Sequence, residues 1–360
     1  MSPPRSSSAR LLHVDALKAL AAQLIVLHHL SAYGPIADAV QSQLPSLIEW
    51  LYRHGRLAVQ VFLVVGGFLS ARALSKRGQL LEGVVPELLW RRYLRLALPF
   101  MAAVGLSLAC GQLVRPWLPA LVPDEVTLPL LLSHALLLHG VLGMDALTAG
   151  AWYVAVDFQL FAMLLLLLWL ARSFRAPQGR RVFIGPLLVL VLAAASLWLF
   201  NRDPGLDDWG LYFFGAYGLG ALVHWVMLSR HPRAYLLLLS AVGLAALALE
   251  WRERVAVALV TAWLLAALQA RHQRAPWRLA PVLGELGTHS YSLFLVHYPV
   301  CLLVNALFVQ QGLAGANAGL AMMALAWGLA NLAALPFHRW IEAPAGRLRL
   351  GPWPTAAQRA

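Results

Sequence analysis

Long apolar segments recur along the whole chain, and they limit its possible folds more than any other feature. A helix needs about twenty apolar residues to cross the roughly 30 Å hydrocarbon core of a bilayer. The chain has 360 residues, of which 60% are hydrophobic and 12% are charged, which argues against a soluble domain. Apolar windows predict ten spans, at residues 14–33, 55–72, 92–113, 150–171, 182–200, 209–229, 233–250, 254–270, 286–310 and 317–338. Because unpaired backbone groups are not tolerated in lipid, we predict an all-α, polytopic integral membrane protein.

The basic residues lie mostly in short loops between these segments. This distribution argues against a nucleic-acid partner, although the formal net charge is +12. With a cytoplasmic N-terminus, 21 of the 28 Lys and Arg residues fall on the cytoplasmic side and six fall outside, as the positive-inside rule requires. We therefore expect both termini in the cytoplasm, with a tail at 1–10, one membrane domain at 11–346 and a second tail at 347–360.

Three further features could be misread. The N-terminal tail and first apolar segment imitate a signal peptide, but polar residues such as Lys18 and Gln23 interrupt the apolar run and no suitable cleavage site follows. A short apolar segment at 127–144 is predicted to be a re-entrant or interfacial helix. Cys110 and Cys301 both fall in predicted spans, so neither a disulfide framework nor a metal site is expected.

The first span carries ionisable side chains, which are costly at membrane depth and usually mark a functional path. Lys18 and His29 are eleven residues apart, close to three helical turns, so they share a face and lie roughly 16 Å apart along the axis. His28 points about 100° away from His29, so both cannot face the same cavity squarely. A buried helix whose histidines are satisfied by neighbours is the alternative.

Two other spans contain candidate polar side chains. Arg92 and Arg95 share a helix face, and arginine forks suit phosphate oxygens, although a plain cytoplasmic anchor is also compatible. Asp157 is expected at a depth similar to that of His29, where a carboxylate needs a partner. A histidine is one candidate, and a structural hydrogen bond to Trp152 or to the backbone is the other.

These residues stand in motifs that resemble one known family. Lys18, ten residues and then His29 are similar to the Arg/Lys-x10-His motif of the membrane acyltransferase-3 family. Arg92 and Arg95 are similar to its Arg-x-x-Arg motif. Further similar segments are Phe62–Phe68, Trp152–Phe161, Ser290–Pro299 and Ile341–Pro344. Within the first of these, Leu63 and Gly66 depart from the usual Phe and Ser, so a hydrogen bond made by that Ser is missing here.

The resemblance implies transfer of an acyl group across the membrane. The donor would be cytoplasmic acyl-CoA, most often acetyl-CoA, and the acceptor a hydroxyl of a glycan or lipid-linked sugar at the outer face. His29 would act as general base or transient acyl carrier. Lys18 would guide or polarise the donor, Asp157 would assist the histidine, and Arg92 with Arg95 would bind the donor. No bound cofactor or metal is expected.

Other residues complete the expected site. Trp152, Tyr291, His297 and His28 would line the cavity. Three residues are assigned structural roles: Gly67 would permit close helix packing, Pro299 would loosen its helix and free a carbonyl, and Glu342 would pair with cytoplasmic arginines.

Two non-enzymatic functions stay open. A transporter or flippase would also need intramembrane charges and a proline-broken helix, but we find no inverted repeat. An accessory subunit of a polysaccharide synthesis or export complex is the other alternative. The composition, rich in Ala, Leu and Arg, suits a bacterium with a GC-rich genome, and we assume a bacterial inner membrane. The sequence does not decide which glycan accepts the acyl group, such as exopolysaccharide or O-antigen. It also does not decide whether that group is acetyl or succinyl.

Overall fold

A computed structural model of the chain describes residues 11–75, 78–79, 84–174, 178–271 and 280–348. These residues form helices and turns without a β-strand, so the all-α prediction is confirmed. The predicted tail at 1–10 and most of the tail at 347–360 lie outside the described residues.

The predicted spans correspond to helices in the structure. The long helices are α1 (Leu12–Ala32), α4 (Ala58–Leu74), α5 (Val85–Val114), α7 (Ala151–Ser173), α8 (Gln178–Trp198), α9 (Gly210–Met227), α10 (Pro232–Leu249), α11 (Glu253–Arg271), α13 (Ser290–Gln310) and α14 (Ala316–Phe337). The short ones are α2 (Pro35–Gln41), α3 (Pro45–His54), α6 (Leu128–Ala135), α12 (Ala280–Thr288) and α15 (Ala343–Ala345). Within the described ranges, nine helical stretches are long and apolar enough to cross a membrane, and α1 with α2 adds a tenth as a pair bent by 87°.

Several predicted boundaries differ from the structure, and α5, for example, begins at Val85 and not at residue 92. The span expected from residue 55 begins earlier, because α3 continues through a 3-10 turn at Gly55–Leu57 into α4. The span expected at 286–310 is divided at His289 into α12 and α13. Just before this break α12 approaches α1 closely, because a Cβ on Gly287 would lie 2.4 Å from the carbonyl oxygen of Asp15. α12 therefore packs tightly across the start of α1.

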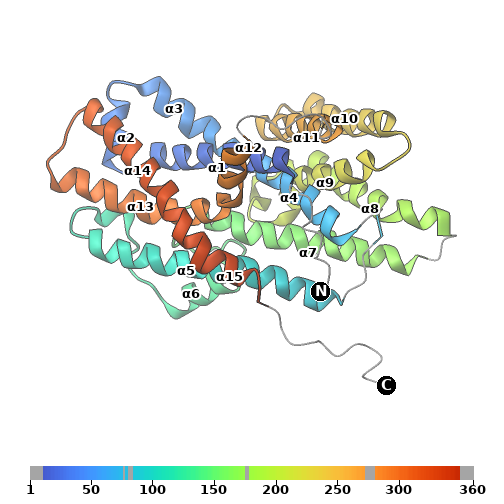
Figure 1. Ribbon diagram of the computed structural model, residues 1–360, viewed down its shortest axis with the longest axis horizontal. Helices are drawn as coiled ribbons and strands as arrows, with labels where there is room; N and C mark the ends of the chain where they lie inside the picture. The colour runs from blue at the N-terminus through green and yellow to red at the C-terminus, as the bar shows by residue number, and fades with distance from the viewer. Residues whose placement is uncertain (1–10, 76–77, 80–83, 175–177, 272–279, 349–360) are drawn as a thin grey trace, which may run out of the picture.

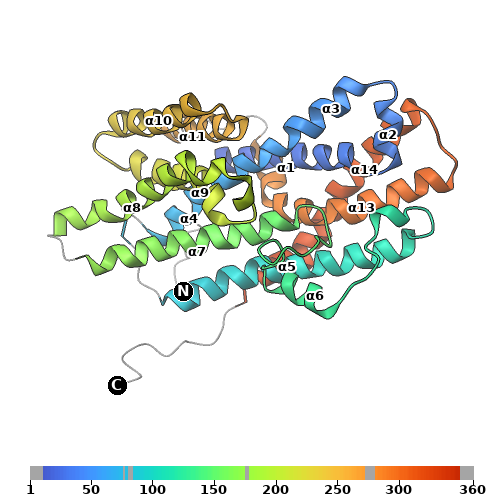
Figure 2. The same ribbon diagram turned by 180° about the vertical axis from the view of Figure 1, so that it is seen from behind.

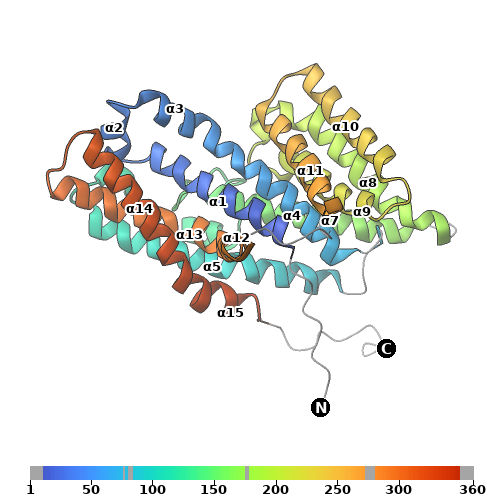
Figure 3. The same cartoon turned by 45° about the horizontal axis from the view of Figure 1, so that its top comes forward.

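The helices α1 and α4 lie in the middle of the bundle (Figures 1 and 3). α13 and α14 lie to one side of them, and α8 to α11 lie to the other side. Seen from behind, α7 lies between α5 and α9, and α6 lies on the outer side of α5 (Figure 2). α1 can therefore present side chains to both halves of the molecule.

The crossing of α4 and α9 brings two backbones into contact. A Cβ on Gly67 would lie 1.8 Å from the carbonyl oxygen of Tyr217, and a Cβ on Gly220 would lie 1.8 Å from that of Val64. Any side chain at either glycine would force the helices apart. Gly67, to which we assigned a structural role, lies at this crossing.

The apolar segment at 127–144 forms the eight-residue helix α6 followed by turns, and not one continuous helix. It packs along the length of α5 and not across its end. The Tyr93 hydroxyl donates a hydrogen bond to the carbonyl of Ala135 at 2.7 Å, and Ser107 donates to the Thr148 hydroxyl at 2.9 Å. This folding back brings the start of α7 alongside the interior of the bundle.

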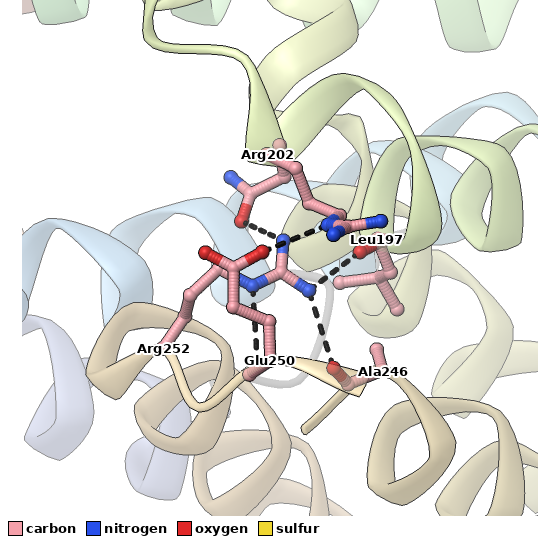
Figure 4. A network of polar contacts seen from close by, with 6 residues as sticks. Leu197, Arg202, Ala246, Glu250 and Arg252 are labelled. Atoms are coloured by element: carbon pink, nitrogen blue, oxygen red, sulfur yellow. Dashed lines mark hydrogen bonds and ion pairs between the residues drawn. The ribbon is translucent and has the colours of Figure 1, made fainter. Parts of the chain in front are cut away.

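A polar network around Arg252 joins the end of α8 to the turn between α10 and α11 (Figure 4). The guanidinium donates hydrogen bonds to Asn201 Oδ1 at 2.9 Å and to the carbonyl of Leu197 at 2.8 Å. Arg202 forms an ion pair with Glu250 at 2.8 Å, and this hydrogen bond lowers the pKa of the Glu250 carboxyl. The network holds loops that the charge distribution predicts to be outside.

Candidate active site

Two histidines face each other at the contact between α1 and α13. His29 comes from α1 and His297 from α13, and their rings stack with centroids 4.7 Å apart and an interplanar angle of 22°. Both side chains are buried, with exposed fractions of 8% and 2%. α13 continues through Pro299, which has no N–H to offer to the carbonyl of Leu295 one turn earlier. The pair therefore lies beside a helix with one open backbone acceptor.

The histidine pair is short of hydrogen-bond partners. Within the described part of the chain, neither ring nitrogen of His297 nor Nδ1 of His29 has a partner that meets hydrogen-bond geometry. The backbone of the preceding turn lies close to each ring, at Ile25 for His29 and at Leu293 and Phe294 for His297, and offers only weak hydrogen bonds. Buried polar groups are almost always hydrogen-bonded, and an exception calls for an explanation. A substrate hydroxyl could supply the missing partner.

The neighbouring His28 has a different environment. Its Nδ1 lies 3.2 Å from the carbonyl of Leu51 on α3. A Cβ on Gly55 would lie 2.8 Å from the His28 Cβ, so this histidine is packed against the turn before α4. Of the two adjacent histidines, only His29 stacks on His297. The geometry therefore favours His29 as the residue that faces substrate.

Aromatic rings connect the histidine pair to α7. Tyr33 stacks on His29 with centroids 5.8 Å apart, and Tyr298 meets Tyr33 edge-on at 5.4 Å. On the other side, Phe294 lies 6.1 Å from the His297 ring, and Tyr153 of α7 lies 5.4 Å from Phe294.

A buried ion pair forms the second polar centre. Arg92 of α5 donates a hydrogen bond to the Asp157 carboxylate of α7, and its guanidinium lies 5.2 Å from the centroid of the Phe161 ring. The Arg92 Nε is buried and has no partner among the described residues. Asp157 therefore pairs with an arginine, and the histidine partner that we considered for it is wrong. The prediction placed Asp157 at the depth of His29. In the structure the segment at 127–144 folds back along α5, and Asp157 lies level with the first turns of α5, where Arg92 is found.

Tyr291, Arg95 and Glu342 surround this centre. The Tyr291 hydroxyl donates to the carbonyl of Leu96 at 2.9 Å. Arg95 is within electrostatic range of Arg92, Asp157, Tyr291 and Glu342. The π-helical turn His338–Glu342 follows α14, and turns of this kind are frequent at functional sites.

Glu342 has partners other than the expected arginines. Its carboxylate accepts a hydrogen bond from Ser292 at 2.5 Å and contacts His338 Nδ1 at 3.0 Å. Arg95 interacts with the Glu342 carboxylate electrostatically, at longer range. The direct arginine pairing that we expected is therefore replaced by a contact between α13 and the turn after α14.

The two centres lie within two turns of each other along α13, at positions about 120° apart around the helix. Tyr291 and His297 are six residues apart on this helix, which corresponds to roughly 9 Å along its axis. Tyr153 and Phe294 lie between them. The arginines and the histidine pair are therefore roughly two helical turns apart along α13, with aromatic side chains between them.

Lys18 lies apart from these two centres, whereas the ring of Trp152 meets that of Tyr153 edge-on, with centroids 6.2 Å apart. The Lys18 ammonium is 3.8 Å from the Asp15 carboxylate on the same helix, roughly 16 Å along the axis from His29. Trp152 stacks on Phe213 of α9, with centroids 5.4 Å apart.

Several aromatic residues of the site were not singled out from the sequence. Tyr33 follows His29 by four residues and so shares its helix face, a spacing that could have identified it. Tyr153 and Tyr298 lie inside motif segments but carry no pattern of their own. Within the described ranges, no group of three His, Cys, Asp or Glu residues could hold a metal ion.

Comparison with known proteins gives a consistent assignment. Residues 11–336 match the acyltransferase-3 family model, described as an acyltransferase domain. A curated relative in Caenorhabditis elegans, named regulator of hypoxia-inducible factor 1, is 24% identical over 409 aligned positions. That alignment covers 95% of this chain and 80% of the relative. No solved structure matches the chain.

Proposed function

The chain belongs to the membrane acyltransferase-3 family, and we propose that it moves an acyl group from cytoplasmic acyl-CoA to a hydroxyl of an extracytoplasmic glycan. It is a multi-pass membrane acyltransferase. The acyl group is proposed to be acetyl, and the acceptor a glycan or lipid-linked sugar in a bacterial inner membrane. A polysaccharide synthesis or export complex would use the product.

The observation that carries the proposal is the buried, unsatisfied histidine pair. In the proposed reaction, the acceptor hydroxyl donates its hydrogen bond to His29, which takes the proton as the oxygen attacks the thioester carbonyl. The bond from carbonyl carbon to sulfur breaks, and the CoA thiolate receives the proton from the imidazole. The products are an O-acyl ester and free CoA. General-base catalysis of this kind contributes about 10²–10⁴-fold in rate.

His297 is proposed to assist by sharing the face of the His29 ring. Because the two rings are stacked 4.7 Å apart, both cannot be cationic without strong repulsion. A proton taken up at His29 is therefore readily released again. A covalent acyl-His29 intermediate would use the same neutral imidazole and is the second form of this mechanism.

The donor is proposed to bind at the arginine centre. Arg92 keeps one unpartnered N–H, and Arg95 is exposed beside it. Guanidinium groups bind phosphate oxygens well, and CoA carries phosphates. Asp157 holds Arg92 in place, and its proposed role is to position the donor site and not to relay protons to His29. Lys18 is proposed to guide the donor from the cytoplasmic side.

The test is mass spectrometry and proton NMR of purified surface and secreted glycans. Four strains are compared: wild type, a deletion, and the deletion carrying His29→Ala or His28→Ala at equal membrane abundance. We expect the O-acyl signal to disappear in the deletion and in His29→Ala, and to persist in His28→Ala. The missing signal would identify both the acyl group and the acceptor.

Other results would change the proposal. Unchanged acylation with less exported glycan in the deletion would favour a transporter or an accessory subunit. Acylation lost in the deletion but kept in His29→Ala would retain the enzyme and remove His29 from the chemistry.

A further inference from the structure

A groove between α8, α9 and α10 lies away from the candidate active site. These three helices are neighbours in the bundle (Figures 1 and 3). The groove has a cavity volume of about 980 Å³, at the upper end of the roughly 300–1,000 Å³ typical of ligand pockets. Along α8 it extends from Phe183 to Leu190, which is roughly 10 Å or two helical turns.

The walls of the groove are apolar. Its lining residues from the three helices are Phe183, Pro186, Leu187, Leu190, Leu222, Trp225, Val226, Leu228, Leu238 and Leu239. Leu187 and Leu238 stand on facing helices, and both are about half exposed. Such a surface attracts hydrocarbon and not water.

The groove faces the bilayer. α8 and α10 are among the least covered of the candidate spans, with 28% and 17% of their apolar windows buried. An apolar groove that opens to the hydrocarbon of a bilayer is filled by lipid chains, because no water is available there. The remaining question is which lipid binds.

The mouth of the groove is basic. Arg230 and His231 line it at the turn between α9 and α10, together with Ser229 and Tyr235, and no carboxylate is among the lining residues described. The charge distribution predicts this turn to be cytoplasmic. Basic pockets between transmembrane helices on that side bind anionic lipid head groups.

We propose that the groove binds one anionic phospholipid from the inner leaflet. Its acyl chains lie against α8 and α10, and its head group lies at Arg230 and His231. The lipid would link α10 to the rest of the bundle. This site is independent of the proposed acyl transfer, since its test needs no acceptor.

The experiment is native mass spectrometry of the full chain after reconstitution with phosphatidylglycerol or phosphatidylcholine and extraction into mild detergent. We expect one retained phosphatidylglycerol and little phosphatidylcholine. Arg230→Gln should weaken phosphatidylglycerol retention about fivefold, as expected for the loss of one cationic contact. Leu187→Trp, which narrows the apolar wall, should weaken retention of either lipid.

The matched control is Arg233→Gln, which removes a charge three residues from Arg230 at a position that does not line the groove. It should retain lipid like the wild type. Equal retention of the two lipids by the wild type, or equal loss in Arg230→Gln and Arg233→Gln, would overturn the proposal. The unfolding temperature of each variant, measured beside the wild type, shows that it is folded.

Discussion

The buried nitrogens of Arg252 have hydrogen-bond partners, whereas most of those in the pair His29 and His297 have none among the described residues. Arg252 is 8% exposed, and each of its guanidinium nitrogens donates to an oxygen (Figure 4). His297 is more deeply buried, and neither of its nitrogens has a partner within the described residues. A satisfied network contributes to stability, whereas an unsatisfied buried group costs about 1–3 kcal/mol. The first network holds the loops together, and the missing hydrogen bonds of the second support the chemical role that we propose for the histidine pair.

The sharpest test of this contrast is His297→Phe. Phenylalanine keeps a ring stacked on His29 and removes two unsatisfied nitrogens, so the unfolding temperature should stay the same or rise. Acylation should fall by about 10²-fold or more, because His29 loses the neighbour that limits its protonation. The activity is measured as O-acyl groups per glycan at equal protein abundance.

His28→Phe serves as the control for replacing an imidazole with a phenyl ring, at the position adjacent to His29. It removes a contact to the Leu51 carbonyl and lies outside the proposed chemistry, so acylation should persist. If His297→Phe acylates normally, the missing hydrogen bonds of the histidine pair are unrelated to catalysis, and the comparison with Arg252 does not identify an active site.

The Arg92–Asp157 pair is intermediate between the fully hydrogen-bonded Arg252 and the unsatisfied histidine pair. The ion pair is formed, but one Arg92 N–H has no partner among the described residues. Asp157→Asn leaves a buried guanidinium without its counter-ion, which should destabilise the protein by about 3–5 kcal/mol. The double variant Arg92→Met with Asp157→Leu should recover much of this stability and still fail to acylate.

Thermal unfolding in detergent, followed with a thiol-reactive dye, measures the change. Cys110 and Cys301 are both free and buried, so they react only as the helices separate. An Asp157→Asn protein as stable as the wild type would show that Arg92 finds another anion, and the pair would lose its structural role.

Arg252→Met should affect stability alone. Methionine retains an apolar stem but leaves the Asn201 and Leu197 oxygens without their donor. We expect a loss of about 2 kcal/mol with unchanged acylation per folded molecule. If acylation falls and the unfolding temperature does not, the loops around Arg252 belong to the acceptor site.

The sequence predicted the spans well because length and hydropathy decide whether a segment can cross a membrane. It also singled out His29 and Arg92, because intramembrane charges are rare enough to stand out, and the roles given to these residues stay predictions. It could not predict their partners. Asp157 pairs with Arg92 because the segment at 127–144 folds back along α5, and this follows from tertiary packing and not from local pattern. In the same way, the close contact of Gly287 with α1 belongs to tertiary packing and has no local sequence pattern.

The smallest expected effect concerns Gly66, which stands where the similar motif of the acyltransferase-3 family usually has serine. A Cβ there would lie 3.7 Å from Asp157 Oδ1 and 3.3 Å from Tyr217 Cε2. In Gly66→Ser the new hydroxyl can donate to the carboxylate, while Gly66→Ala meets the same tyrosine without that hydrogen bond. Since both variants share the steric contact, their difference isolates the hydrogen bond. We expect Gly66→Ser to be more stable than Gly66→Ala by about 1 kcal/mol, measured by thermal unfolding. Equal stability would mean that the Asp157 carboxylate is already satisfied by Arg92, and this centre would then resemble the Arg252 network more than the histidine pair.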